Sequence, residues 1–220
     1  MVERERGSSD RPGWRIVIAG TGGQGVITAA RLLATFFVQR GQQVVSSQLH
    51  GMAQRGGAVQ AAVMIDCGIS PTIPAGAADC VIGLEPVETV RALPYMSPRT
   101  TVFMNTAPVV PFVLAQQYVR GRGSGAYPDC DALREQIRGI TPILFDVDAT
   151  ALARRAGLAN TLNVVMLGCL FGSGLLDVKP EEFIDIVMTT APPKVAEANS
   201  RAFQYGVEYG ERIKSLRELR

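Results

Sequence analysis

Three glycines near the start of the chain have the spacing of a phosphate-binding turn. They fit the pattern G-x-G-x-x-G within the run GTGGQG. Glycines let a backbone approach a ligand closely, and free N–H groups at a helix start favour an anion. We therefore predict an anion-holding turn, most simply for a phosphate, formed by Gly20, Thr21, Gly22, Gly23, Gln24 and Gly25. A tight strand–helix turn without a ligand has the same spacing, so the motif alone does not decide.

The region around this turn lacks the carboxylate that a dinucleotide site needs. In an NAD-binding fold, an Asp or Glu about 20 residues further on binds the ribose hydroxyls. Residues 11–65 contain no Asp or Glu, but they include Arg11, Arg15, Arg31, Arg40 and Arg55. This pattern disfavours NAD and favours another phosphate-bearing ligand or an acidic partner surface.

A second candidate segment is the run HGMAQRGG at residues 50–57. Its glycines, amide and cation suit an anion or the loop of a partner protein. We count Gln54, Arg55, Gly56 and Gly57 among the candidate ligand-binding residues. His50 is the only histidine in the chain, and it is a candidate for chemistry, although a lone histidine is more often structural.

No complete catalytic set is visible beside these two segments. The nucleophile pattern G-x-S-x-G is absent, and a single histidine cannot build a typical zinc site. The four cysteines include no C-x-x-C pair, so we predict neither a metal site nor an iron–sulfur cluster held by this chain alone. Glu85 is expected to stabilise the start of a helix.

The elements that must position these residues follow from the apolar patterns. Six strands are predicted, at residues 15–20, 43–48, 58–65, 79–84, 100–105 and 143–147. Helices are predicted at residues 22–39, 86–93 and 132–137, and from residue 148 onward the pattern is helical. The fold class is α/β: a mostly parallel, Rossmann-like sheet with helices on both faces and a helical C-terminal third.

The composition is typical of a soluble globular domain. The chain has 220 residues and a net charge of +2, which makes no case for nucleic acid. We expect residues 1–14 to form a flexible tail and residues 15–220 to form one domain. The polar start carries no secretory signal, so a cytoplasmic location is expected. Residues 161–178 read as a buried helix, and no contact with a membrane is predicted.

The motifs resemble a known family. The run Ile18–Val26 is similar to the GxGGQG start of the gamma-type domain of 2-oxoacid:ferredoxin oxidoreductases. Residues 50–57 resemble the matching loop of the indolepyruvate (arylpyruvate) branch, in which this chain is usually called the beta subunit. Residues 83–95 and 160–170 fit that branch as well, and the likeness runs from about Arg15 to about Ala198.

The resemblance implies a component of a larger enzyme. That enzyme oxidatively decarboxylates a 2-oxoacid, forms an acyl-CoA and passes electrons to ferredoxin. Thiamine diphosphate, magnesium and 4Fe–4S clusters would lie in a large partner subunit, and this chain would help to enclose coenzyme A at the interface. Ferredoxin or a flavin subunit would be reached through the complex.

Three alternatives stay open at this point. Phenylglyoxylate-type dehydrogenases resemble the family in this domain but deliver electrons to NAD, and nothing in the sequence separates them. A stand-alone nucleotide-binding module or a purely structural interaction domain would also agree with the glycine turn.

Overall fold

The computed structural model describes residues 13–50, 56–109 and 127–218. The strands are β1 (Trp14–Thr21), β2 (Val44–His50), β3 (Ala58–Ile65), β4 (Cys80–Gly83), β5 (Thr101–Asn105) and β6 (Leu144–Val147). The helices are α1 (Val26–Gln39), α2 (Pro86–Arg91), α4 (Cys130–Arg138), α5 (Ala149–Arg155), α6 (Leu162–Gly172), α7 (Pro180–Thr190) and α8 (Pro193–Glu218). Two 3₁₀ turns, η1 (Leu93–Tyr95) and η2 (Ala159–Thr161), join them.

The six described strands form one mostly parallel sheet in the order β2-β3-β1-β4-β5-β6. Strands β1, β4, β5 and β6 pair in parallel, whereas β3 runs antiparallel to both of its neighbours. The predicted α/β class is therefore confirmed. One detail differs from a simple strand–helix–strand unit, because β3 lies between β1 and β2.

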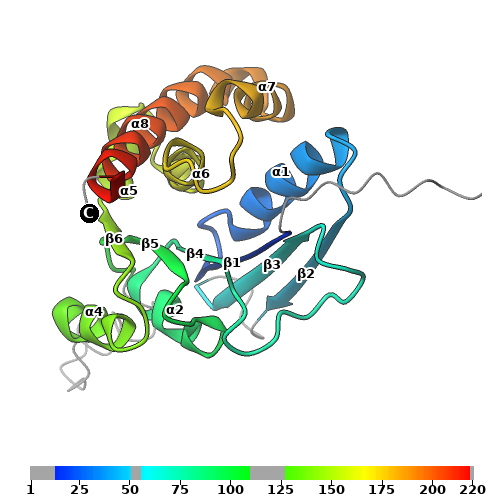
Figure 1. The fold of residues 1–220 in the computed structure, drawn as a ribbon. Helices are drawn as coiled ribbons and strands as arrows, with labels where there is room; N and C mark the ends of the chain where they lie inside the picture. Colours follow the sequence, from blue (N-terminus) through cyan, green and yellow to red (C-terminus); the bar gives the residue numbers. More distant parts are fainter. Residues whose placement is uncertain (1–12, 51–55, 110–126, 219–220) are drawn as a thin grey trace, which may run out of the picture.

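Helices cover both faces of this sheet, as predicted (Figure 1). Helix α1 and helices α5 to α8 share a core with the face that carries Ile16 and Ile18. On the opposite face, Val17 and Val81 belong to a second core that includes Ile137 of α4. The parallel strands are thus buried on both sides, which explains their continuous apolar runs.

The glycine turn delays the start of α1. Gly25 adopts a left-handed backbone conformation (φ 82°) as the N-cap residue, so the helix begins at Val26 and not at Gly22. At the other end Gly41 has φ 79°, and the N–H of Gln42 donates to the carbonyl oxygen of Phe37. This is the glycine-terminated helix end that the sequence predicts.

Helix α6 is buried along its whole length. The predicted buried helix at residues 161–178 is therefore confirmed for residues 162–172, but it is too long, because the helix ends at Gly172 and Gly174 adopts a left-handed backbone conformation (φ 68°) in the turn that follows. A helix that is apolar on all sides needs neighbours on all sides. Its main neighbour is the long helix α8, and the two cross in close contact in Figure 1. None of the described helices has the length and apolar character needed to cross a membrane.

The helices that follow β1 and β4 lie on opposite faces of the sheet. After β1 the chain enters α1 on one face, and after β4 it enters α2 on the other. In open α/β sheets, ligands bind beyond the carboxyl ends of the strands at such a switch point. The glycine turn stands at this position.

Candidate functional site

Packing is by itself enough to require a glycine at the first position of the turn. A Cβ atom at Gly20 would lie 2.9 Å from both Gln24 Oε1 and Val26 Cγ2, and 3.0 Å from Leu84 Cβ. A side chain at position 20 would therefore displace the start of α1 from the sheet. By contrast, Gly23 (φ 101°) has no atom within 4 Å of such a Cβ and faces open space.

Gln24 ties the turn together from inside. Its Oε1 accepts hydrogen bonds from the backbone N–H of Thr21 (2.7 Å) and from the Thr21 hydroxyl (3.0 Å). Its Nε2 donates to the carbonyl oxygen of Leu84 at the end of β4 (2.9 Å). The side chain that the motif places among candidate ligand contacts is thus committed to the turn's own structure.

A buried amide extends this network to the neighbouring strands. Asn105, at the end of β5, is fully buried, and its Nδ2 donates to the same Leu84 carbonyl oxygen (3.0 Å). The Asn105 amide also contacts the Thr150 hydroxyl of α5, with Nδ2 3.2 Å from Oγ1. The carboxyl ends of β1, β4 and β5 are therefore joined by two side-chain amides around one carbonyl.

The second predicted segment reaches the turn from the other side. The N–H of Gly22 donates to the carbonyl oxygen of Gly57 (2.8 Å), and Thr21 pairs with Ala58 across β1 and β3. The structure thus brings Gly57 to the glycine turn. Gln54 and Arg55 lie outside the described residues, as does the side chain of His50, whose backbone ends β2.

Glu85 has the structural role that its position predicts. It is buried, and its Oε2 accepts the N–H of Glu88 as the N-cap of α2 (2.9 Å). Its Oε1 accepts a hydrogen bond from the Tyr127 hydroxyl and another from the N–H of Val109 (3.3 Å). The three donors hold the Glu85 carboxylate in place at the start of α2.

Glu88 gives this region a pH dependence. Burial raises the pKa of its carboxyl, Arg91 opposes the rise, and Glu85 adds to it. The unfolded chain therefore releases this proton at a lower pH than the folded chain, and stability falls as the pH rises above the ordinary pKa of Glu.

We expect Glu88→Gln to be more stable than the wild type at about pH 7, with the difference vanishing below about pH 4. Chemical denaturation at both pH values measures this, and a less stable variant at neutral pH would contradict it. Glu135→Gln on exposed α4 is the control.

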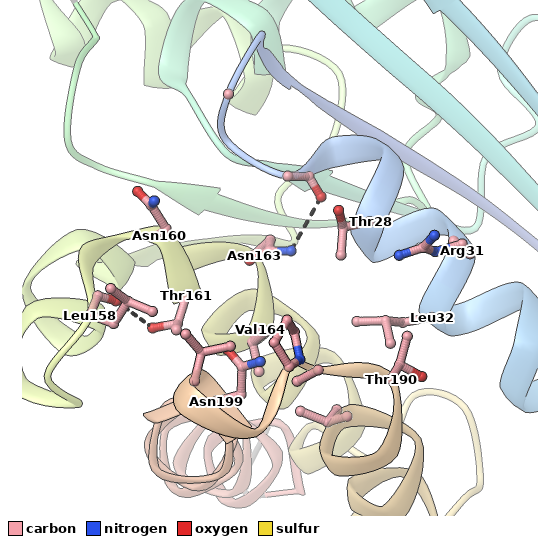
Figure 2. Close-up of a pocket in the computed structure, with 16 residues that line it drawn as sticks. Thr28, Arg31, Leu32, Leu158, Asn160, Thr161, Asn163, Val164, Thr190 and Asn199 are labelled. Atoms are coloured by element: carbon pink, nitrogen blue, oxygen red, sulfur yellow. Dashed lines mark hydrogen bonds between the residues drawn. The ribbon is translucent and has the colours of Figure 1, made fainter. Parts of the chain in front are cut away.

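A cavity of about 430 Å³ opens on the side of the turn away from Gly57. Its walls come from the start of α1, the start of α6 and the corner between α7 and α8 (Figure 2). The volume lies in the range of small-molecule sites. No sequence pattern marks this cavity, because its walls come from segments more than a hundred residues apart.

Polar groups gather in this cavity, and no carboxylate lines it. Its polar side chains are Thr28, Arg31, Asn160, Thr161, Asn163, Thr190 and Asn199. In Figure 2 Arg31 lies along α1 and points back toward Thr28. Within the described part of the chain, Arg31 makes no ion pair or hydrogen bond. The cavity therefore presents an unpaired cation among neutral polar groups.

Two helix starts border the same cavity. Neither α1 nor α6 has a side-chain cap or an acidic residue in its first turn. The first N–H groups of a helix have no partner inside the helix, and its dipole is positive at that end. Asn163 bridges the two starts, because its Nδ2 donates to the carbonyl oxygen of Gly25 (3.2 Å; Figure 2). The arrangement suits an anionic group.

Comparison with known proteins identifies the family. The family model described as pyruvate ferredoxin/flavodoxin oxidoreductase matches residues 15–209. The chain belongs to this family. It is a gamma-type subunit of a 2-oxoacid:ferredoxin oxidoreductase, and so part of a multi-subunit complex.

Curated relatives of this gamma-type subunit have nearly the same length. The chain is 34% identical to indolepyruvate oxidoreductase subunit IorB of Archaeoglobus fulgidus, over 87% of the chain and 92% of that protein. It is 33% identical to the subunit of the same name from Pyrococcus horikoshii, over 92% of the chain and 98% of that protein.

Solved structures of lower identity share the fold. The gamma subunit of a keto/oxoacid ferredoxin oxidoreductase from Geobacter sulfurreducens superposes with a TM-score of 0.62 at 22% identity, over 90% of the chain and 99% of that subunit. A 2-oxoglutarate:ferredoxin oxidoreductase from Magnetococcus marinus gives 0.66 at 16% identity, over 92% of this chain but 32% of that one. In the Magnetococcus protein the same fold is thus one part of a longer chain.

The gamma-type subunit does not offer a cluster site in its described residues. Cys80 and Cys169 are buried, Cys67 and Cys130 are half-buried, and all four are free thiols. No group of three or more His, Cys, Asp or Glu side chains in the described ranges could hold a metal ion.

Proposed function

We propose that this subunit serves an enzyme that oxidatively decarboxylates an aryl 2-oxoacid, such as indolepyruvate, to an acyl-CoA and passes the electrons to ferredoxin. The observation that carries the proposal is the 34% identity to an indolepyruvate oxidoreductase subunit over 92% of that subunit's length. The 2-oxoglutarate synthase subunit of the same Archaeoglobus species shares 28%. The run HGMAQRGG at residues 50–57 also favours the aryl branch.

In this proposal the large partner subunit holds thiamine diphosphate, magnesium and the iron–sulfur clusters. Thiamine diphosphate supplies the decarboxylation chemistry when it is bound there. The gamma-type subunit forms part of the cleft for coenzyme A, using the glycine turn and residues 54–57. Coenzyme A carries a pyrophosphate and a 3′-phosphate, and uncapped helix starts favour such groups.

The substrate assignment is tested on the complex purified from its native host. Metal and thiamine content are measured first, and then CoA-dependent reduction of ferredoxin with indolepyruvate, pyruvate and 2-oxoglutarate. We expect a thiamine-containing partner to co-elute and indolepyruvate to give the highest kcat/KM. A chain that elutes alone, or a complex that prefers 2-oxoglutarate, would contradict the proposal.

The CoA assignment is tested by two substitutions in the same complex. Arg55→Ala removes a cation suited to phosphate, and Gly22→Ala adds a methyl group beside the turn. Because a hydrogen bond to a charged group contributes about 1.5–3 kcal/mol, we expect the KM for CoA to rise roughly 10-fold or more. An unchanged CoA requirement in both variants would count against this role. Arg99→Ala, an exposed arginine before β5, is the matched control.

A further inference from the structure

One edge of the sheet is left open by the described part of the chain. Strand β2 lies at the end of the strand order, on the side away from α6, α7 and α8 (Figure 1). The opposite edge strand, β6, has only four residues, and the Tyr209 hydroxyl of α8 donates to the carbonyl oxygen of its Asp146. By contrast, β2 has seven residues and contains no proline, Asp, Glu, Lys or Arg, and it pairs with β3 without a bulge. Proteins usually protect an edge strand with such features.

Every second residue of β2 directs its backbone groups outward. The N–H of Asp66 donates to the carbonyl oxygen of Gln43 (2.8 Å), so Gln43 faces β3. Because hydrogen bonding alternates along an antiparallel strand, Val44, Ser46 and Gln48 direct their N–H and C=O groups away from β3. No described residue outside the strand ladder donates to these groups or accepts from them. The edge therefore offers a row of backbone donors and acceptors to another strand.

Exposed apolar side chains flank this edge on both faces of the sheet. On one face Leu49, 63% exposed, lines a hollow of about 140 Å³ between β2 and the segment that follows β3. Ile69 in that segment is 83% exposed. On the other face, Ile27 and Val38 lie three turns apart on α1 and point away from Leu32, which lines the cavity toward α6 and α7. Apolar side chains that gather around an open edge mark a protein interface.

We propose that two copies of this chain pair through β2, antiparallel across a two-fold axis, so that their sheets join into one. Such a contact requires a self-complementary surface, and β2 provides one. With Ser47 at the axis, Ser46 of one copy and Gln48 of the other form a hydrogen-bonded pair. In the same register Val45 of one copy lies opposite Leu49 of the other, which is a favourable apolar pair. No like charges meet along the strand, because β2 carries no charged residue of the Asp, Glu, Lys or Arg type.

The same axis accounts for the exposed residues of α1. A two-fold axis perpendicular to the sheet keeps both α1 helices on one face and makes them antiparallel. Val38 of one copy therefore faces Ile27 of the other across the axis. One surface thus supplies both halves of each apolar pair, which favours a second copy over a different chain. Pairing also removes the open edge from both copies.

Sedimentation of the full chain tests the pairing. We expect a species of twice the chain mass of 23.6 kDa. Ser46→Pro removes an outward N–H from each copy and leaves the bonds to β3 intact, so the Kd of the dimer should rise roughly 10- to 100-fold. Ser46→Thr keeps this N–H and is the matched control, and circular dichroism compares the folding of both variants. A monomeric wild type, or equal dimerisation of folded Ser46→Pro and Ser46→Thr, would overturn the proposal.

Disulfide cross-linking tests the register and does not depend on Ser46→Pro. Cα atoms of a non-hydrogen-bonded antiparallel pair lie about 4.5 Å apart, which suits a disulfide. We expect Ser47→Cys to form a covalent dimer on mild oxidation, both in the free chain and in the assembled complex. The wild type, with its four free cysteines, and Ser215→Cys, at an exposed position of α8, should not.

The outcome in the complex identifies the occupant of the edge. A Ser47→Cys complex that gives no covalent dimer, or one cross-linked to the large subunit instead, would overturn the proposal, because another chain would then cover β2. The inference is independent of the proposed substrate, since neither experiment uses a 2-oxoacid or coenzyme A.

Discussion

Replacing Gly206 with alanine is expected to lower the free energy of unfolding by roughly 2–4 kcal/mol. A Cβ atom at this position of α8 would lie 2.0 Å from the carbonyl oxygen of Val165 and 2.9 Å from the Cα atom of Gly168 in α6. Both contacts are with backbone, which cannot rotate away as a side chain can. The two helices would have to separate along their contact.

The position of Gly206 makes this clash costly. A Cβ atom at Gly168, Gly172 or Gly210 would lie 2.3–2.5 Å from a backbone oxygen of the opposing helix, so the glycines form a continuous line of contact. Helix α6 is buried on all sides, and a shift away from α8 would push it into the sheet. Separation would also open voids beside Phe203 and its aromatic neighbours.

Thermal unfolding of the full chain measures this effect. For a domain of this size, about 2–4 kcal/mol corresponds to a Tm lowered by roughly 5–15 °C. The control is Gly139→Ala at the end of α4, where the nearest atoms to a Cβ lie at 3.4 and 3.5 Å and φ is −62°. That variant should be neutral or slightly stabilised. A Gly206→Ala protein as stable as Gly139→Ala would show that α6 and α8 adjust without cost.

The sequence predicts the elements of this fold better than it predicts their arrangement. The spacing of apolar residues and the glycines at the ends of the elements locate β1 and α1, because these signals are local. The sequence does not predict that antiparallel β3 lies between β1 and β2, because the length and composition of the segment between β2 and β3 specify no pairing partner. The glycine contacts of α6 and α8 likewise join residues that are distant in the chain.

The sequence likewise predicts the glycine turn of the candidate site but not the residues that surround it. The GTGGQG pattern predicts a turn between a strand and a helix, and the turn is present. Which N–H groups remain free depends on Gly57, Leu84 and Asn163, which are remote in sequence. Asn163 is part of the run NTLN, and no local pattern marks it as a bridge between two helix starts. Arg31 carries a sequence signal only as one arginine in an acid-free segment.

Replacing Gln24 with leucine is expected to destabilise the chain by roughly 2–4 kcal/mol, although the motif suggests a ligand contact. The substitution removes three hydrogen bonds and leaves the N–H of Thr21 unpaired in a half-buried turn. Leucine has a similar volume, so lost packing contributes little. The loss of stability therefore reports the contribution of these hydrogen bonds at the carboxyl ends of the strands.

Coupling to Asn105 distinguishes this structural role from ligand binding. Both side-chain amides donate to the Leu84 carbonyl oxygen, so either can keep that oxygen paired when the other is absent. Chemical denaturation of Gln24→Leu, Asn105→Leu and the double variant gives their interaction energy. We expect the double variant to lose about 0.5–2 kcal/mol more than the sum of the single losses. Strict additivity, with a Gln24→Leu chain as stable as the wild type, would contradict the structural role of Gln24.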